Sequence, residues 1–145
     1  MNEVNEINEI NEILNDFEFF DTWEDKYQHI IDLGRKLTPI DECFKNDEYK
    51  LKGCQSTVYF ITKENPDGTL NFSANSDSFI VQGLIALLLK VFSNKQPSDI
   101  LNTNINFLST IGLENHLSPT RKNGLHSMIE KIRTEAKSRV NRFEE

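Results

Sequence analysis

Apolar and polar residues follow a helical period in the N-terminal quarter of the chain. Residues 2–13 repeat the triplet Asn-Glu-Val/Ile, so an apolar residue recurs every three positions. A helix turns once per 3.6 residues, so this stripe drifts around the axis, and we expect a short, weakly docked helix that runs on to Phe17 or Phe20. Residues 22–37 carry one apolar face and end at Thr38, because the proline that follows disfavours helix.

Two further helices are predicted in the second half. Residues 79–92 are apolar nearly all round, which is typical of a buried helix, and Gly83 within it is expected to allow close packing on a strand. Later, Ser118 has the N-cap residue type and Pro119 suits the first helical position. From Leu125 onward the apolar positions mark a final amphipathic helix, and short helices are expected near residue 97 and over 105–113.

Between these helices the pattern changes to strands. Residues 56–63 are mostly β-branched or aromatic, and residues 65–68, Asn-Pro-Asp-Gly, are typical of a turn. A strand over residues 69–74 then completes an antiparallel hairpin, and one more strand is expected to begin near Tyr49 or Leu51. The predicted fold class is therefore α+β, with a small antiparallel three-stranded sheet packed against helices.

Length and charge limit the classes of protein. The 145 residues suit one core domain, which we place at 20–145, preceded by a low-complexity helical extension at 1–19. A net charge of −7 disfavours binding to nucleic acid or to an anionic membrane surface, both of which need clustered Lys and Arg. The run 79–92 is too short to cross a bilayer, and the start lacks a signal-peptide pattern, so a cytoplasmic location is expected.

The chain has two cysteines, too few for a disulfide framework. Cys54 follows Gly53 at a junction between loop and predicted strand, where another protein could reach its thiol. A lone cysteine is more often a small buried hydrophobe than a nucleophile. Cys43 lies in a polar connector, where an incidental cysteine is favoured over a resolving thiol.

Four ordered segments carry a more specific signal. Residues 53–58 read G-C-Q-S-T-V, residues 76–86 contain S-D followed by I-V-Q-G-L-I-A, and residues 117–125 read L-S-P-T-R-K-N-G-L. With the helix at 23–34, these segments resemble the SufE family of cysteine-desulfurase sulfur acceptors, over about residues 20–136. Two positions depart from the family pattern: Tyr59 replaces the usual Trp, and Asn75 stands where an acidic residue is common.

The resemblance implies a SufE/IscU-like fold and a role in sulfur transfer. A SufS-like cysteine desulfurase, which uses pyridoxal phosphate, would pass sulfane sulfur to Cys54 as a persulfide. The protein would stimulate that enzyme and deliver the sulfur to a SufBCD-like scaffold for iron–sulfur cluster assembly. It would therefore act as an acceptor and activator rather than as a stand-alone enzyme, with no cofactor or metal of its own.

The transfer chemistry suggests which residues support Cys54. Only a thiolate attacks well, so a neighbour is expected to lower the thiol pKa. Lys52 and Arg121 are the cationic candidates, and the backbone N–H groups of Gln55 and Ser56 could hold a sulfur anion. Gly53 is the expected hinge of the loop. Asp77, with Ser76, is expected to cap a helix and also to position the loop.

Other functions remain open at the level of sequence. The alternative is an IscU-like iron–sulfur cluster scaffold, although two cysteines and three histidines form no obvious ligand set for a cluster or for zinc. A cysteine hydrolase would need His116 or His126 as a base close to Cys54. In a plain interaction domain, Cys54 would be buried and inert.

Overall fold

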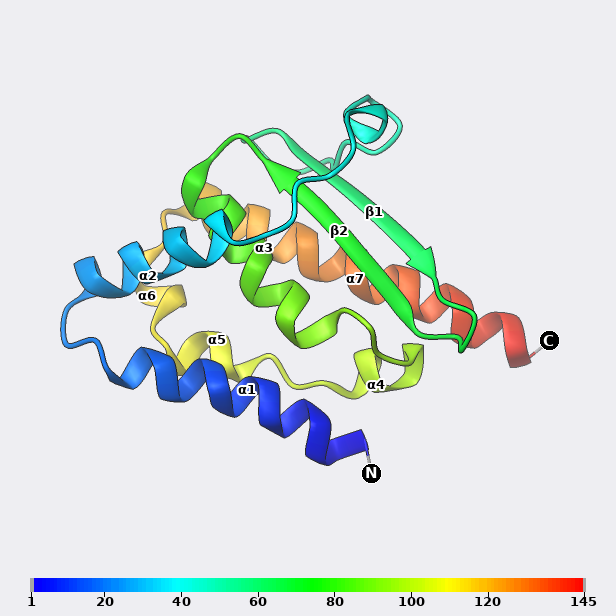
Figure 1. Cartoon of the computed structure of the whole chain (residues 1–145), viewed down its shortest axis with the longest axis horizontal. Coiled ribbons are helices and arrows are strands. Elements are labelled where there is room, and N and C mark those ends of the chain that lie inside the picture. The colour runs from blue at the N-terminus through cyan, green and yellow to red at the C-terminus, as the bar shows by residue number, and fades with distance from the viewer. Residues whose placement is uncertain (1, 145) are drawn as a thin grey trace.

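The computed structural model describes the backbone of residues 2–144 and the side chains of residues 8–140. The fold is α+β, as predicted (Figure 1). Its elements in chain order are α1 (Asn2–Glu18), α2 (Trp23–Arg35), the 3-10 helix η1 (Glu42–Phe44), β1 (Val58–Glu64), β2 (Leu70–Ser76), α3 (Phe79–Phe92), α4 (Pro97–Asn102), α5 (Asn106–Thr110), α6 (Leu113–His116) and α7 (Pro119–Glu144).

The apolar helix α3 is the centre of the core and packs against α1, α2, β2 and α7 (Figure 1). Nine of its residues are buried, which confirms the prediction of a buried helix. Ser78 is its N-cap and accepts a hydrogen bond from the Val81 N–H. Phe79 was expected to be buried with the rest, but 71% of it is exposed, whereas Ile80 and Val81 in the same turn are buried.

Gly83 makes a close contact with a helix, and the expectation that it packs on a strand was wrong. A Cβ atom at Gly83 would lie 2.1 Å from the Ile30 carbonyl oxygen of α2, and one at Gly34 would lie 2.6 Å from the Gly83 nitrogen. The two glycines therefore let the backbones of α2 and α3 approach each other.

The sheet within residues 2–144 has two strands, and the predicted third strand is only an isolated bridge. β1 pairs with β2 in antiparallel register, from Val58 opposite Ser76 to Glu64 opposite Leu70. Beside β1, Leu51 N–H donates to Val58 O, but turns precede this segment and Gly53 follows it at φ +90°. The chain therefore leaves the sheet after one bridge. The hairpin turn is confirmed, with Gly68 at φ +88°.

Helix α1 is present as predicted, and it docks more firmly than its drifting stripe suggested. Ile13 and Phe17 are buried in the core, and ion pairs join Glu12 to Lys90 and Glu9 to Lys95. The apolar residues of the first two triplets lie outside the described side chains. The division of the chain at residue 19 stays a prediction.

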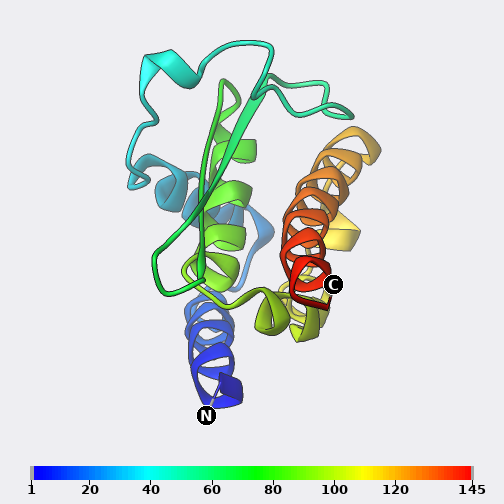
Figure 2. The same ribbon diagram turned by 90° about the vertical axis from the view of Figure 1, so that its right-hand side faces the viewer.

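Helix α7 lies beside the hairpin and α3, and its N-terminal end lies below the loop that leads into β1 (Figure 2). Ser118 accepts a hydrogen bond from the Arg121 N–H, and Pro119 is the first helical residue, as predicted. The short helix α6 before it was not expected. None of the helices within residues 2–144 is long and apolar enough to span a membrane.

Candidate functional site

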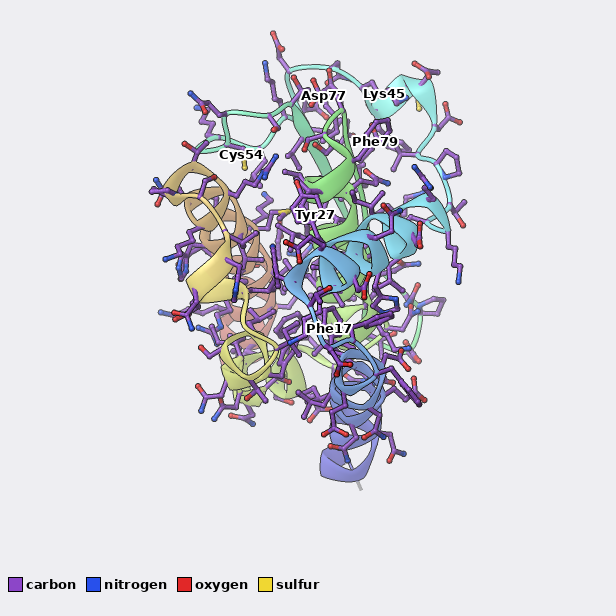
Figure 3. All side chains as sticks on the ribbon, turned by 90° about the vertical axis from the view of Figure 1, so that its left-hand side faces the viewer. Phe17, Tyr27, Lys45, Cys54, Asp77 and Phe79 are labelled. Atoms are coloured by element: carbon purple, nitrogen blue, oxygen red, sulfur yellow. The ribbon has the colours of Figure 1, made fainter. Side chains whose placement is uncertain are left out.

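Cys54 lies in the loop between the isolated bridge and β1, beside the N-terminal end of α7 (Figure 3). The thiol is half-buried, and its S–H donates to the Gly124 carbonyl oxygen of α7 at an Sγ–O distance of 3.9 Å. A Cβ atom at Gly124 would lie 3.7 Å from Sγ, which is ordinary van der Waals contact, so the thiol packs closely against the backbone of α7. The loop thus turns its thiol toward α7 rather than into open solvent.

A small cavity of about 20 Å³ lies beside the thiol. On the same measure, roughly 10–15 Å³ is needed to hold one water molecule, so this cavity has room for one small group. Its lining comes from three parts of the chain, the Cys54 loop, α3 and the first turns of α7: Cys54, Gln55, Ser56, Val81, Thr120, Arg121 and Gly124. The predicted residues Gln55, Ser56 and Arg121 are therefore brought together with Cys54.

Two side chains hold the loop on either side of Cys54. The Asp77 carboxylate accepts a hydrogen bond from the Thr57 N–H at 3.2 Å, so Asp77 contacts the loop that it is predicted to position. The predicted capping role belongs instead to Ser78, while the Ser76 hydroxyl accepts from the Ser78 N–H. On the other side, the Ser127 hydroxyl of α7 donates to the Gly53 carbonyl oxygen at 3.5 Å.

Gly53 is required by both its backbone angle and its surroundings. Its φ of +90° is one that other residues rarely adopt, and a Cβ atom there would lie 2.6 Å from the Ser127 hydroxyl oxygen. Sequence reasoning identified Gly53 but missed Ser127. No local pattern could have found Ser127, because its contact with the loop spans 74 positions of the chain.

Arg121 and Lys52, the two cationic candidates, lie in different places. Arg121 lines the cavity beside Cys54, and its guanidinium carbon lies 5.9 Å from the centre of the Tyr27 ring. Lys52 is exposed and lines a separate, wider cleft of about 540 Å³ between the hairpin side and α7. Lys52 is therefore not among the residues that surround the thiol.

Burial raises the pKa of the Cys54 thiol above its ordinary value. The pKa therefore moves in the opposite direction from the expectation that a neighbour lowers it, and burial is the cause. The thiol is protonated at neutral pH in this conformation. The raised pKa leaves less of the reactive thiolate at neutral pH.

The residues of the other sequence hypotheses lie apart from this cavity. His116 stacks on Trp23 with ring centres 4.4 Å apart, and its Nδ1 lies 2.8 Å from the Gly112 carbonyl oxygen. His126 is exposed and does not line the cavity. Cys43 is exposed in η1. Among residues 8–140, no group of three or more His, Cys, Asp or Glu side chains is arranged to hold a metal ion.

The chain matches a known protein family. The family model described as SufE, Fe-S metabolism associated domain, matches residues 11–136. An uncharacterized SufE-like protein of Rhizobium meliloti is 40% identical over 131 residues, which cover 88% of this chain and 94% of that protein. A second, from Rhizobium etli, is 41% identical over 133 residues, which cover 88% of each chain.

The fold has a solved counterpart at low sequence identity. The solution structure of a hypothetical protein from Thermus thermophilus superposes with a TM-score of 0.73. The match covers 92% of this chain and 96% of that chain, at 16% identity. It supports the arrangement of helices and hairpin described above.

Proposed function

Because the chain belongs to the SufE family, whose model describes an Fe-S metabolism associated domain, we propose that it accepts sulfane sulfur on Cys54 from a cysteine desulfurase. The observation that carries the proposal is the position of the thiol. It lies in a loop that side chains hold by single hydrogen bonds, beside a cavity with room for one small group. Such a site suits a sulfur atom that must be accepted, sheltered and released.

The transfer is a thiol exchange. The Cys54 thiolate attacks the outer sulfur of the donor persulfide, a new S–S bond forms at Cys54, and the donor S–S bond breaks. The donor leaves as a thiolate and takes up the proton that Cys54 lost. No electrons are gained or lost overall, so the step needs no external oxidant or reductant. Removal of the persulfide frees the desulfurase for another turnover, which accounts for stimulation.

The buried, protonated resting thiol has a consequence for this exchange. A persulfide outside a partner complex is easily lost to other thiols, so a sheltered position protects it. Docking of the desulfurase would shift the loop around Gly53, hydrate the thiol and lower its pKa toward the ordinary value. The same loop would then present the persulfide to a SufBCD-like scaffold in the cytoplasm for iron–sulfur cluster assembly.

Intact-mass measurement tests the proposal. The protein is mixed with a SufS-like desulfurase, pyridoxal phosphate and cysteine, without reductant. We expect a mass gain of one sulfur atom that a thiol reductant removes. The two cysteines provide a matched pair of variants: Cys43→Ser should keep the gain and Cys54→Ser should lose it.

Stimulation is measured in the same mixture as the rate of cysteine turnover. It should rise with the wild-type protein and with Cys43→Ser, but not with Cys54→Ser. A mass gain that persists in Cys54→Ser would contradict the assignment of the acceptor. So would a failure to gain sulfur from two active desulfurases while Cys54 still reacts with an alkylating reagent.

A further inference from the structure

Among residues 8–140, the Arg121 guanidinium has an aromatic partner and no acidic one. Its carbon lies 5.9 Å from the centre of the Tyr27 ring, within the range of a cation–π contact. Among residues 8–140, Arg121 forms no ion pair with an Asp or Glu side chain. The same side chain lines the cavity beside Cys54. Its positive charge therefore lies at the cavity of Cys54, with no ion-paired carboxylate from residues 8–140.

Tyr27 is itself held by neighbours on α2 and α6. The Tyr27 and Trp23 rings pack edge to face, with their centres 6.3 Å apart. His116 stacks on Trp23, and its Nδ1–H donates to the Gly112 carbonyl oxygen, since a carbonyl can only accept. Figure 3 shows Tyr27 on the same side of the molecule as Cys54. The three rings therefore form a continuous series of contacts that ends at the Arg121 side chain.

The nature of this support determines what Arg121 can do. A carboxylate would also fix a guanidinium, but it would cancel most of the field that a nearby anion feels. The face of an aromatic ring attracts the cation through its quadrupole and leaves the net charge in place. A cation fixed in this way stabilises a thiolate, or the anionic outer sulfur of a persulfide.

We propose that Tyr27 is a positioning residue, which holds the Arg121 guanidinium at the Cys54 cavity so that it stabilises the anionic sulfur. The inference deepens the proposed function and rests on it for its biological meaning. Its chemistry applies to the thiolate as well as to the persulfide. It can therefore be tested with a reagent that needs no partner protein.

The test is the pH profile of Cys54 alkylation by iodoacetamide, in a Cys43→Ser background so that one thiol reacts. Below the thiol pKa the rate follows the thiolate fraction. Tyr27→Leu should slow alkylation about two- to fivefold near neutral pH and move the profile to higher pH, with the same plateau at high pH. Tyr27→Phe keeps the ring and should behave as the parent protein. Circular dichroism verifies the fold, and Tyr27→Met is a second variant without a ring.

The double variant distinguishes positioning from a general structural effect. If Tyr27 acts through Arg121, then Tyr27→Leu should cause no further slowing in an Arg121→Leu background. Equal slowing in both backgrounds would overturn the inference. So would a changed plateau with an unshifted profile, or a Tyr27→Phe variant as slow as Tyr27→Leu. The expected alkylation profiles together with no sulfur uptake from a desulfurase would refute the proposed function alone.

Discussion

Replacement of Gly53 by alanine tests whether the conformation of the loop controls access to Cys54. Alanine at the Gly53 φ of +90° costs roughly 1–2 kcal/mol, and a less flexible unfolded chain offsets about 0.4–1 kcal/mol of this. The new Cβ would lie 2.6 Å from the Ser127 hydroxyl oxygen, which must rotate away and lose its long hydrogen bond to the Gly53 carbonyl. The net strain is therefore about 1 kcal/mol.

Only weak interactions hold the Cys54 loop in place against this strain. A hydrogen bond contributes only about 0.5–1.5 kcal/mol, and Ser127 and Asp77 each supply one long or exposed bond. We therefore expect the Cys54 loop to open while the domain stays folded. A shift of about 1 kcal/mol toward the open loop raises the open fraction about fivefold, and Cys54 alkylation should accelerate by that factor.

Gly68→Ala is the matched control. Gly68 has nearly the same φ, +88°, but it lies in the hairpin turn and its new Cβ would meet only the Gln96 amide at 3.5 Å. Urea unfolding should show a loss of about 1 kcal/mol for this variant, with Cys54 alkylation unchanged. Equal acceleration in both variants would show that global stability controls access. No acceleration in Gly53→Ala would refute the reasoning about the loop.

Two other predictions follow from the surroundings of the thiol. Gly124→Ala places a methyl group 3.7 Å from Sγ, so sulfur uptake measured by intact mass should slow. Because the alanine lies inside helix α7, urea unfolding should show unchanged stability or a gain of up to about 1 kcal/mol. Unchanged uptake would mean that the cavity does not hold the incoming sulfur. Burial raises the pKa of the Cys54 thiol in the folded protein. The stability that the neutral thiol contributes is therefore complete below the pKa of the unfolded state, about 8.5, and it is lost as the pH rises through the pKa of the folded state. The wild-type protein should therefore lose more stability than Cys54→Ala between about pH 8 and pH 10 in urea titrations, and parallel curves would contradict this.

The helices could be predicted because local signals specify them. Thr22 caps α2 and Ser118 caps α7 through hydrogen bonds that span three residues, so the sequence around each helix start contains the information. The expected third strand failed for a reason that is not local. Its residue types permit a strand, but the left-handed Gly53 and the contacts with α7 take the chain away from β1 after one bridge.

The sequence predicted only those site residues that lie within the recognised motifs. Gly53, Cys54 and Arg121 stand in short recognisable segments, and the fold brings them together. Gly124 and Tyr27 acquire their roles only from contacts between segments far apart in the sequence, Gly124 with the Cys54 loop and Tyr27 with Arg121 of α7. In the sequence, Tyr27 is one apolar position on a helix face. The raised pKa of Cys54 likewise depends on burial, which the residues around it do not reveal.

Cys54 and the carbonyl group on α7 that accepts its hydrogen bond lie far apart in the sequence, and this affects when the contact can form during synthesis. The Gly124 carbonyl follows the cysteine by 70 positions, and Ser127 follows Gly53 by 74. At roughly 5–20 residues per second, a ribosome needs about 4–14 seconds to add 70 residues. During that interval the nascent thiol has no α7 against which to pack. Burial of the Cys54 thiol against α7 is therefore among the last contacts that the growing chain acquires, and nascent chains that end between residues 54 and 124 contain Cys54 without this contact.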